Sequence, residues 1–124
     1  MPKFFKPNEL KCKCGQCGST GEEMDVSFMC MLDAIREKYK KPMILTSAYR
    51  CATYNSRVSS SGSSGAHTTG KAVDVLTRGE DAILLIKIAL TEGIIGLGVD
   101  QKNSGRFIHL DMCNKLPRPM IWSY

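Results

Sequence analysis

The sequence predicts an α+β fold, with a small and mainly antiparallel sheet flanked by two main helices. Two stretches, 25–40 and 80–92, have the apolar spacing of helices. Short apolar runs typical of strands lie between and after them, and the last two flank the turn-rich stretch 100–105 as in a hairpin. Helices and strands in this order, ending in a hairpin, are typical of the α+β class.

Composition limits the classes of protein to consider. With 124 residues, 43% of them hydrophobic and 23% charged, residues 1–124 are expected to form a single domain. Apolar runs stay well below the ~18 residues of a membrane span, and the start of the chain does not resemble a secretory signal. We therefore expect a protein made in the cytoplasm without a signal peptide, and no membrane partner.

The net charge of +5 weakly favours anionic partners such as nucleic acid or cell-wall polymers. The basic residues are scattered, apart from the run at 36–41, which we interpret as a solvated helix end. Aromatic residues do not interleave with the basic ones, as a nucleic-acid-binding surface would need. We expect a monomer that does not bind nucleic acid.

The first helix follows an irregular, cysteine-rich segment at residues 1–23. Asp25 is its predicted N-cap. Cys30 lies within the helix and is expected in the core. The apolar stripe along the helix consists of Phe28, Leu32, Ile35 and Tyr39.

Two strands separated by a loop come next. The first is predicted within 42–50 and the second at 71–77. The Gly/Ser-rich stretch 51–65 between them is predicted to be a flexible loop, and it leads directly into His67, so it is a candidate rim of a site. Alternation in the second strand places Ala72, Asp74 and Leu76 on one face and Val73 and Val75 on the other.

The rest of the chain contains the second helix and the hairpin. Thr77 and Glu80 have the spacing of a capping box, and the helix at 80–92 is expected to stop at Gly93. The two hairpin strands and a Pro-interrupted tail, expected to cover the edge of the core, occupy 94–99, 106–112 and 114–124.

The six cysteines admit more than one interpretation. They are Cys12, Cys14, Cys17, Cys30, Cys51 and Cys113. The first three have the spacing of half a zinc knuckle, and Cys51 or Cys113 could supply a fourth thiolate. Free or packed thiols and disulfides are the alternatives to such a structural metal.

Both histidines of the chain lie near aspartates. His67 precedes Asp74 by seven residues, and Gly70 between them lets the chain bend back into the strand. His109 and Asp111 share one face of a strand, because residues two apart point the same way. A catalytic zinc site needs three protein ligands and one open position, and a nearby carboxylate can accept the proton of a water molecule. The alternative is that these are ordinary polar residues.

Three motifs in order resemble those of one family. They are "SAYR" at 47–50, "HTTGKAVD" at 67–74 and "FIHLD" at 107–111. Together they resemble the zinc D-alanyl-D-alanine peptidases, especially the short single-domain branch found in bacteria and phages, whose zinc fold is shared with the hedgehog signalling domain. The similarity extends over roughly residues 4–122.

The resemblance implies a Zn²⁺ cofactor held by His67, Asp74 and His109. It implies that Arg50 binds a substrate carboxylate or the developing oxyanion, and that Ser47 orients the motif or the substrate. The implied reaction is hydrolysis of an amide bond in peptidoglycan stem peptides, by a D-Ala-D-Ala carboxypeptidase or an L,D- or D,D-endopeptidase. A phage-type lysin, released to act on the cell wall, would fit a short basic chain.

The chain departs from the family pattern at two positions. Gly65 stands where the family often has a serine, and Arg106 stands where many members have the catalytic acid. Since arginine cannot act as a base near neutral pH, Asp111 is the first candidate for the catalytic base and Asp100 the second.

Two other functions are consistent with the same residues. A domain of this fold could bind zinc without catalysis and act as a partner-binding module. The cysteine spacing and positive charge would also fit a zinc-knuckle protein that binds nucleic acid.

Overall fold

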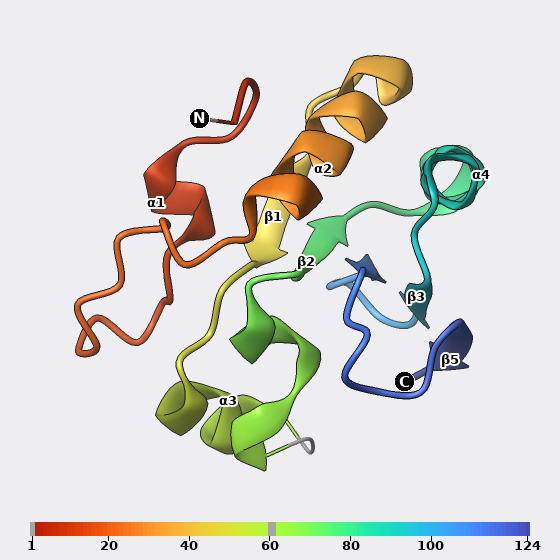
Figure 1. Ribbon diagram of the computed structural model, residues 1–124. Coiled ribbons are helices and arrows are strands. Elements are labelled where there is room, and N and C mark those ends of the chain that lie inside the picture. Colours follow the sequence, from red (N-terminus) through yellow and green to blue (C-terminus); the bar gives the residue numbers. More distant parts are fainter. Residues whose placement is uncertain (1, 60–61) are drawn as a thin grey trace.

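The structure, a computed structural model, describes residues 2–59 and 62–124 (Figure 1). In this part of the chain the helices precede or separate the first three strands, the last three strands follow one another, and short 3-10 helices are labelled η. The order is α1 (Pro7–Leu10), α2 (Val26–Tyr39), β1 (Ile44–Ser47), α3 (Ala52–Val58), η1 (Gly62–Ser64), η2 (Ala66–Thr69), β2 (Ala72–Leu76), α4 (Gly79–Glu92), β3 (Gly96–Asp100), β4 (Phe107–Asp111) and β5 (Met120–Ser123).

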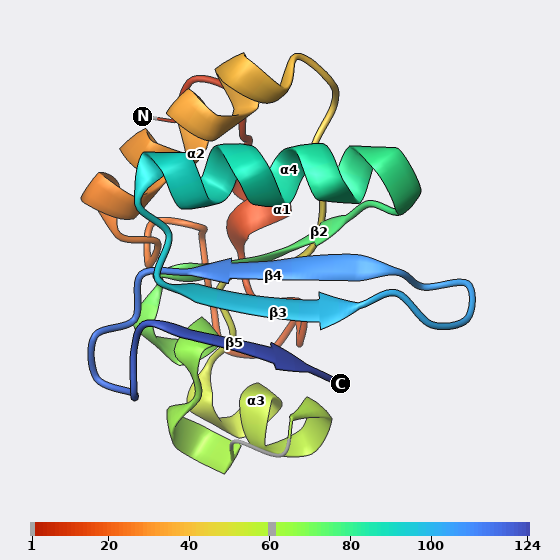
Figure 2. The same ribbon diagram turned by 90° about the vertical axis from the view of Figure 1, so that its right-hand side faces the viewer.

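The strands form one sheet in the order β1-β2-β4-β3-β5. Neighbouring strands are antiparallel except β3 and β5, which are parallel. The long helices α2 and α4 pack against each other on one side of the strands, and α3 lies on the other side (Figure 2). The predicted α+β class and mainly antiparallel sheet are confirmed, while the C-terminal tail extends the sheet through β5, where we expected it only to cover the core edge.

Alternation along the central strands separates the core from the opposite face of the sheet. Val73 and Val75 of β2 are fully buried in the hydrophobic cluster that includes the predicted stripe of α2. Asp74 lies between these two valines, so its side chain points to the other face. The same applies to His109, which lies between the buried Ile108 and Leu110 of β4.

The predicted ends of the long helices are partly confirmed. Asp25 caps α2 by accepting a hydrogen bond from the backbone N–H of Phe28 at 2.8 Å. Gly93 ends α4 in the left-handed region, with a φ of 106°. The capping box at Thr77 is wrong, because α4 begins at Gly79 and its N-cap is Arg78, one residue later than predicted. The Thr77 hydroxyl instead lies 3.2 Å from the buried hydroxyl of Tyr39.

Two further predictions about local environment are wrong. Cys30 is exposed, because it lies outside the buried stripe of α2. The stretch 51–65 is not all loop, since α3 occupies Ala52–Val58. Tertiary contacts stabilise this short helix: Asn55 is buried and accepts a hydrogen bond from Arg50 Nη1 at 3.2 Å. Part of the predicted loop, residues 60–61, lies outside the described residues.

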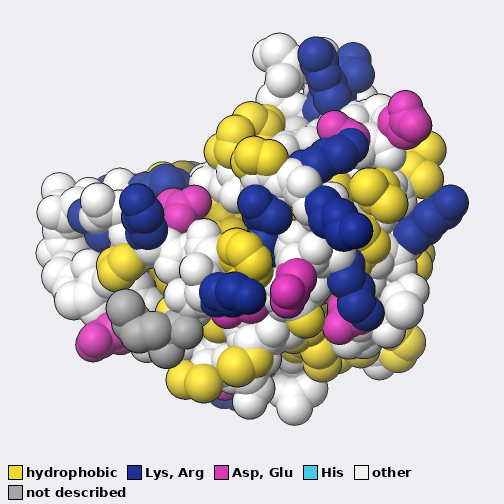
Figure 3. Space-filling view, turned by 90° about the horizontal axis from the view of Figure 1, so that it is seen from above, with side chains coloured by type: hydrophobic (Ala, Val, Ile, Leu, Met, Phe, Trp, Pro, Cys, Tyr) yellow, Lys and Arg dark blue, Asp and Glu magenta, His cyan; other side chains and the backbone are white. Residues whose placement is uncertain are grey.

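The helices and the charged side chains on the surface bear on the expected class of protein. Among the described residues, each helix is too short or too polar to span a bilayer. The face seen in Figure 3 carries Lys and Arg side chains spread among acidic ones. This mixture agrees with the scattered basic residues of the sequence.

Candidate metal centre

The residues of the three motifs meet on the sheet face opposite the core. The strand register pairs Asp74 on β2 with His109 on β4, and it continues through Gly98 on β3 to Trp122 on β5. A pocket of about 580 Å³ opens over this row. Its described lining includes Arg50, His67, Asp74, His109, Arg118, Trp122 and Tyr124.

A tight turn delivers His67 to the pocket. The 3-10 helix η2 carries His67 and ends at Gly70, whose φ of 74° lies in the left-handed region. A Cβ at Gly70 would lie 2.2 Å from the backbone oxygen of Glu23, so close packing also requires glycine here. His67 is buried, and its Nδ1 lies 2.7 Å from the carbonyl oxygen of Ala48. Because a carbonyl oxygen can only accept, Nδ1 carries the proton and Nε2 keeps its lone pair.

His109 is also oriented by a hydrogen bond from one ring nitrogen, but in this residue the donor is Nε2 and the free lone pair is on Nδ1. Its Nε2 lies 2.7 Å from a carboxylate oxygen of Asp111 and therefore donates. Its Nδ1 then directs a lone pair at Asp74 Oδ1, 3.0 Å away. The Nε2 of His67 lies 3.2 Å from this same oxygen.

Three acceptor atoms thus converge with no hydrogen between them in these tautomers. The ligand atoms of His67, Asp74 and His109 all lie within 4.8 Å of one another, and all three residues are buried. Either a proton on His109 or a cation between the atoms relieves the repulsion. Two imidazoles and a carboxylate, with the outer nitrogen of each imidazole hydrogen-bonded, are the donor set of a catalytic zinc site. The residues present therefore fit the zinc implied by the sequence.

The pKa values of Asp74 and His109 also indicate that the cluster favours a positive charge between its members. Burial raises the pKa of Asp74, but the adjacent imidazoles of His109 and His67, which can carry a proton between themselves and the carboxylate, outweigh burial and hold this pKa well below its usual range. Burial lowers the pKa of His109, yet hydrogen bonds to Asp111 and Asp74 raise it above the ordinary value overall. The cluster therefore stabilises positive charge between its members.

Arg50 approaches the cluster from β1's end and is held by three partners. Its Nε donates to Ser47 Oγ at 2.9 Å, and its Nη1 donates to Asn55. Its Nη2 lies 3.6 Å from Asp74 Oδ2. The Arg50 side chain is 16% exposed, and these partners hold it at a fixed position in the pocket lining. Ser47 contacts Arg50, so in this geometry it orients the motif.

Asp111 lies behind His109, away from Asp74. It is fully buried and accepts from Arg118 Nη2 at 2.8 Å and from Arg118 Nε at 2.9 Å, in addition to His109. The backbone N–H of Cys113 donates to it as well. A carboxylate with every direction occupied is not positioned to accept a proton in the pocket. In this geometry Asp111 orients His109, and its expected role as the catalytic base stays a prediction.

The other expected residues lie outside the described lining of this pocket. Asp100 accepts from the backbone N–H of Lys102, and Arg106 donates to the backbone oxygen of Asn103. Gly65, where the family often has serine, is the N-cap of η2 and makes no side-chain cap.

Sequence reasoning missed the contribution of the C-terminal tail. Trp122 packs against His109 with ring centroids 5.1 Å apart, and the Arg118 guanidinium lies 5.0 Å from the Trp122 ring. Room for these side chains comes from glycines on β3. A Cβ at Gly96 would lie 2.1 Å from Asp111 Oδ1, and one at Gly98 would lie 2.7 Å from Trp122 Nε1. An arginine and two aromatic residues shortly after the H-x-D motif were the available signal.

One of three comparisons with known proteins identifies a family. A model of the family described as peptidase M15 matches residues 3–111. The match includes the motif residues and ends before the tail. No similar protein was found among curated proteins, and none among solved structures.

Proposed function

Because the chain belongs to the peptidase M15 family of zinc metallopeptidases, we propose that it hydrolyses amide bonds in peptidoglycan stem peptides. The observation that carries the proposal is the convergence of the three acceptor atoms of His67, Asp74 and His109 beside Arg50. The activity would be that of a D-Ala-D-Ala carboxypeptidase or of an L,D- or D,D-endopeptidase. A role as a monomeric phage-type lysin that reaches the wall after release from the cell is part of the proposal.

Each pocket residue has a role in this reaction. His67, Asp74 and His109 would hold zinc, which when bound polarises a carbonyl and lowers the pKa of a water molecule. Arg50 binds the terminal carboxylate of the peptide or the developing oxyanion, because its charge is permanent and its position is fixed by Ser47 and Asn55.

A second candidate function rests on the lack of a spare carboxylate in the pocket. Among the described residues that line it, Asp74 is the only carboxylate, and it is a proposed zinc ligand, so the lining offers no second carboxylate as the base. Burial raises the pKa of the Tyr124 hydroxyl, which suits it to donating a hydrogen bond at neutral pH. This observation favours a zinc-binding module of the same fold that binds a partner without hydrolysis.

Digestion of purified muropeptides tests the proposal. The zinc-loaded chain is expected to shorten the stem peptides, and mass spectrometry identifies the bond. Loss of one terminal alanine indicates a carboxypeptidase, whereas two peptide fragments indicate an endopeptidase. A chelator is expected to stop the reaction and added zinc to restore it. If the zinc-loaded chain leaves every muropeptide intact, the hydrolytic function is wrong and the binding module is supported.

Replacing Arg50 is expected to reduce catalysis without removing the metal. In Arg50→Ala we expect kcat/KM to fall by about 100-fold, the usual effect of losing one donor to a developing oxyanion. Zinc content should stay unchanged, because Arg50 lies beside the proposed ligand Asp74, with Nη2 3.6 Å from its Oδ2, but is not itself a ligand. Arg57→Ala, on the exposed side of α3, is the matched control. An unchanged kcat/KM in Arg50→Ala would limit this residue to a structural salt bridge.

A further inference from the structure

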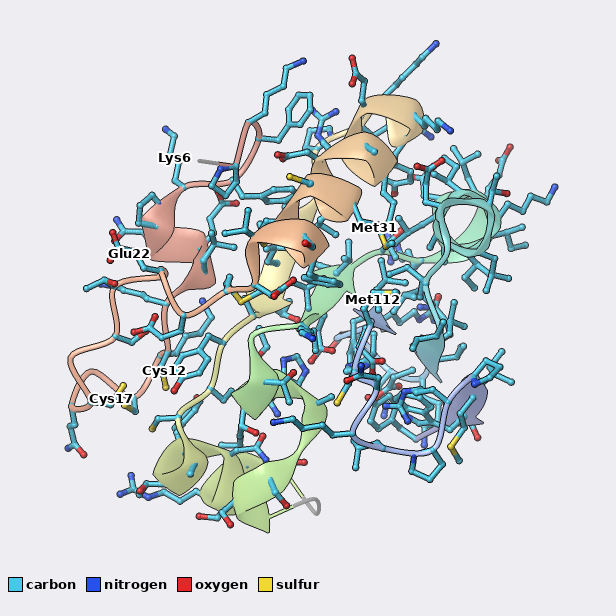
Figure 4. All side chains as sticks on the ribbon, viewed as in Figure 1. Lys6, Cys12, Cys17, Glu22, Met31 and Met112 are labelled. Carbon is cyan, nitrogen blue, oxygen red and sulfur yellow. The ribbon has the colours of Figure 1, made fainter. Side chains whose placement is uncertain are left out.

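A second cluster of metal-binding side chains lies away from the histidine site. Cys12, Cys14 and Cys17 come from the N-terminal segment, and Cys51 is the N-cap of α3. One sulfur from each lies within 4.8 Å of the others. Figure 4 shows the labelled Cys12 and Cys17 side by side in the N-terminal segment. We call these four residues the cysteine cluster.

The sulfur positions match tetrahedral coordination better than a disulfide. Cys14 Sγ and Cys51 Sγ are 3.9 Å apart. Two thiolates on one zinc, with Zn–S bonds near 2.3 Å and tetrahedral angles, are separated by about 3.8 Å. Sulfurs in a disulfide are about 2.05 Å apart, and all four cysteines of the cluster are free thiols in the structure.

The backbone around the cysteine cluster turns so that its N–H groups point at the sulfur atoms. Gly15 and Gly18 directly follow two of the cysteines, and both have φ near +70° (72° and 73°) with open space around them. Glycine is required there by conformation, since the chain turns back after each cysteine. Backbone N–H groups then donate to three of the sulfurs: Gln16 to Cys14, Tyr54 to Cys51, and Cys51 to Cys12. Such donors stabilise negative charge on thiolates.

The sequence left two candidates for the fourth sulfur ligand, Cys51 and Cys113, and the structure places Cys51 with the other three cysteines. Cys51 completes the set, whereas Cys113 is buried beside Asp111 and lies outside the cluster. Cys30 is exposed on α2 and also lies outside it.

We propose that the cysteine cluster binds a second zinc ion as a closed structural site. Four sulfur ligands leave no open position, so this metal would fasten the N-terminal segment to the start of α3. The site also adjoins the pocket through consecutive backbone amides. The N–H of Arg50 donates to the carbonyl of His67 at 3.1 Å, and the next N–H, of Cys51, donates to Cys12 Sγ. Zinc here fixes the backbone that carries Arg50, whether or not the pocket hydrolyses peptides.

Metal analysis separates the two sites. The wild-type chain, purified under reducing conditions, is expected to hold two zinc ions, one for each cluster. His67→Ala should keep one, and its cobalt-substituted form should show an intense sulfur-to-cobalt charge-transfer band. The double variant Cys14→Ser/Cys17→Ser should lose that band and one zinc. Cys30→Ser, which removes a thiol outside the cluster, should retain both.

The other outcomes overturn the proposal. His67→Ala without zinc, or with cobalt but no charge-transfer band, would exclude a thiolate site. Because the double variant could fail to fold, this readout on a chain with intact cysteines decides independently. Alkylation of the unfolded wild type without reductant, followed by mass spectrometry, counts the free thiols. A protected pair among the four would show a disulfide in place of the metal.

Discussion

The Asp74→Ala variant is expected to lose zinc from the histidine site and, with it, all measurable hydrolysis. Asp74 supplies the only negative charge among the three proposed ligands, and its Oδ1 lies 3.0 Å and 3.2 Å from the facing nitrogens of His109 and His67. Its removal leaves two neutral imidazoles facing the permanent charge of Arg50. A cation then loses a ligand and gains an uncompensated positive neighbour. Zinc content after dialysis against a weak chelator measures the effect.

A matched aspartate on the same sheet provides the control. Asp100→Ala removes a carboxylate from β3 that is outside the described lining of the pocket, so zinc and hydrolysis should both persist. Hydrolysis lost in Asp100→Ala with zinc retained would instead identify the base that the pocket lacks. Circular dichroism of both variants checks that the fold is intact. Zinc affinity in Asp74→Ala equal to that of the wild type would show that the ligand set is wrong.

The central part of the site could be predicted because its residues lie on regular strands. Period-two alternation places Asp74 on the face opposite Val73 and Val75, and it places His109 and Asp111 on one face. The turn at Gly70, in the motif at 67–74, could also be predicted, because a left-handed residue before a strand favours glycine. These are local properties, and the structure agrees with them.

The surroundings of the site depend on contacts between distant segments. The pairing of β5 with β3, which carries Trp122 next to His109, is a parallel contact that no local pattern indicates. The role of Asp111 depends on Arg118, seven residues later in the chain, whose guanidinium donates a hydrogen bond to the Asp111 carboxylate. Thr77 has the local signal of a helix cap, but its hydroxyl contacts Tyr39 from a different helix. In each case tertiary structure overrides a locally reasonable prediction.

Asp111→Ala is expected to weaken zinc binding by about 10–100-fold, the usual effect of removing a partner that orients a ligating histidine. Asp111 accepts the Nε2 proton of His109 and thereby keeps the Nδ1 lone pair directed at the metal position. It also neutralises Arg118, whose side chain is 7% exposed. Leaving a buried charge unpaired costs about 3–5 kcal/mol, so the free energy of unfolding should fall by a similar amount.

Asp111→Asn separates the orienting role from a role as base. The amide oxygen can still accept from His109 Nε2, so this variant should retain more zinc affinity than Asp111→Ala. Neither variant carries a base at position 111. If Asp111 were the catalytic base and had no orienting role, both variants would therefore lose hydrolysis equally, and their zinc affinity would stay at the wild-type value. Chelator competition gives the affinity, and hydrolysis is assayed at saturating zinc. With zinc saturated, we expect Asp111→Asn to recover substantial hydrolysis, because its remaining defect is in how firmly His109 is held.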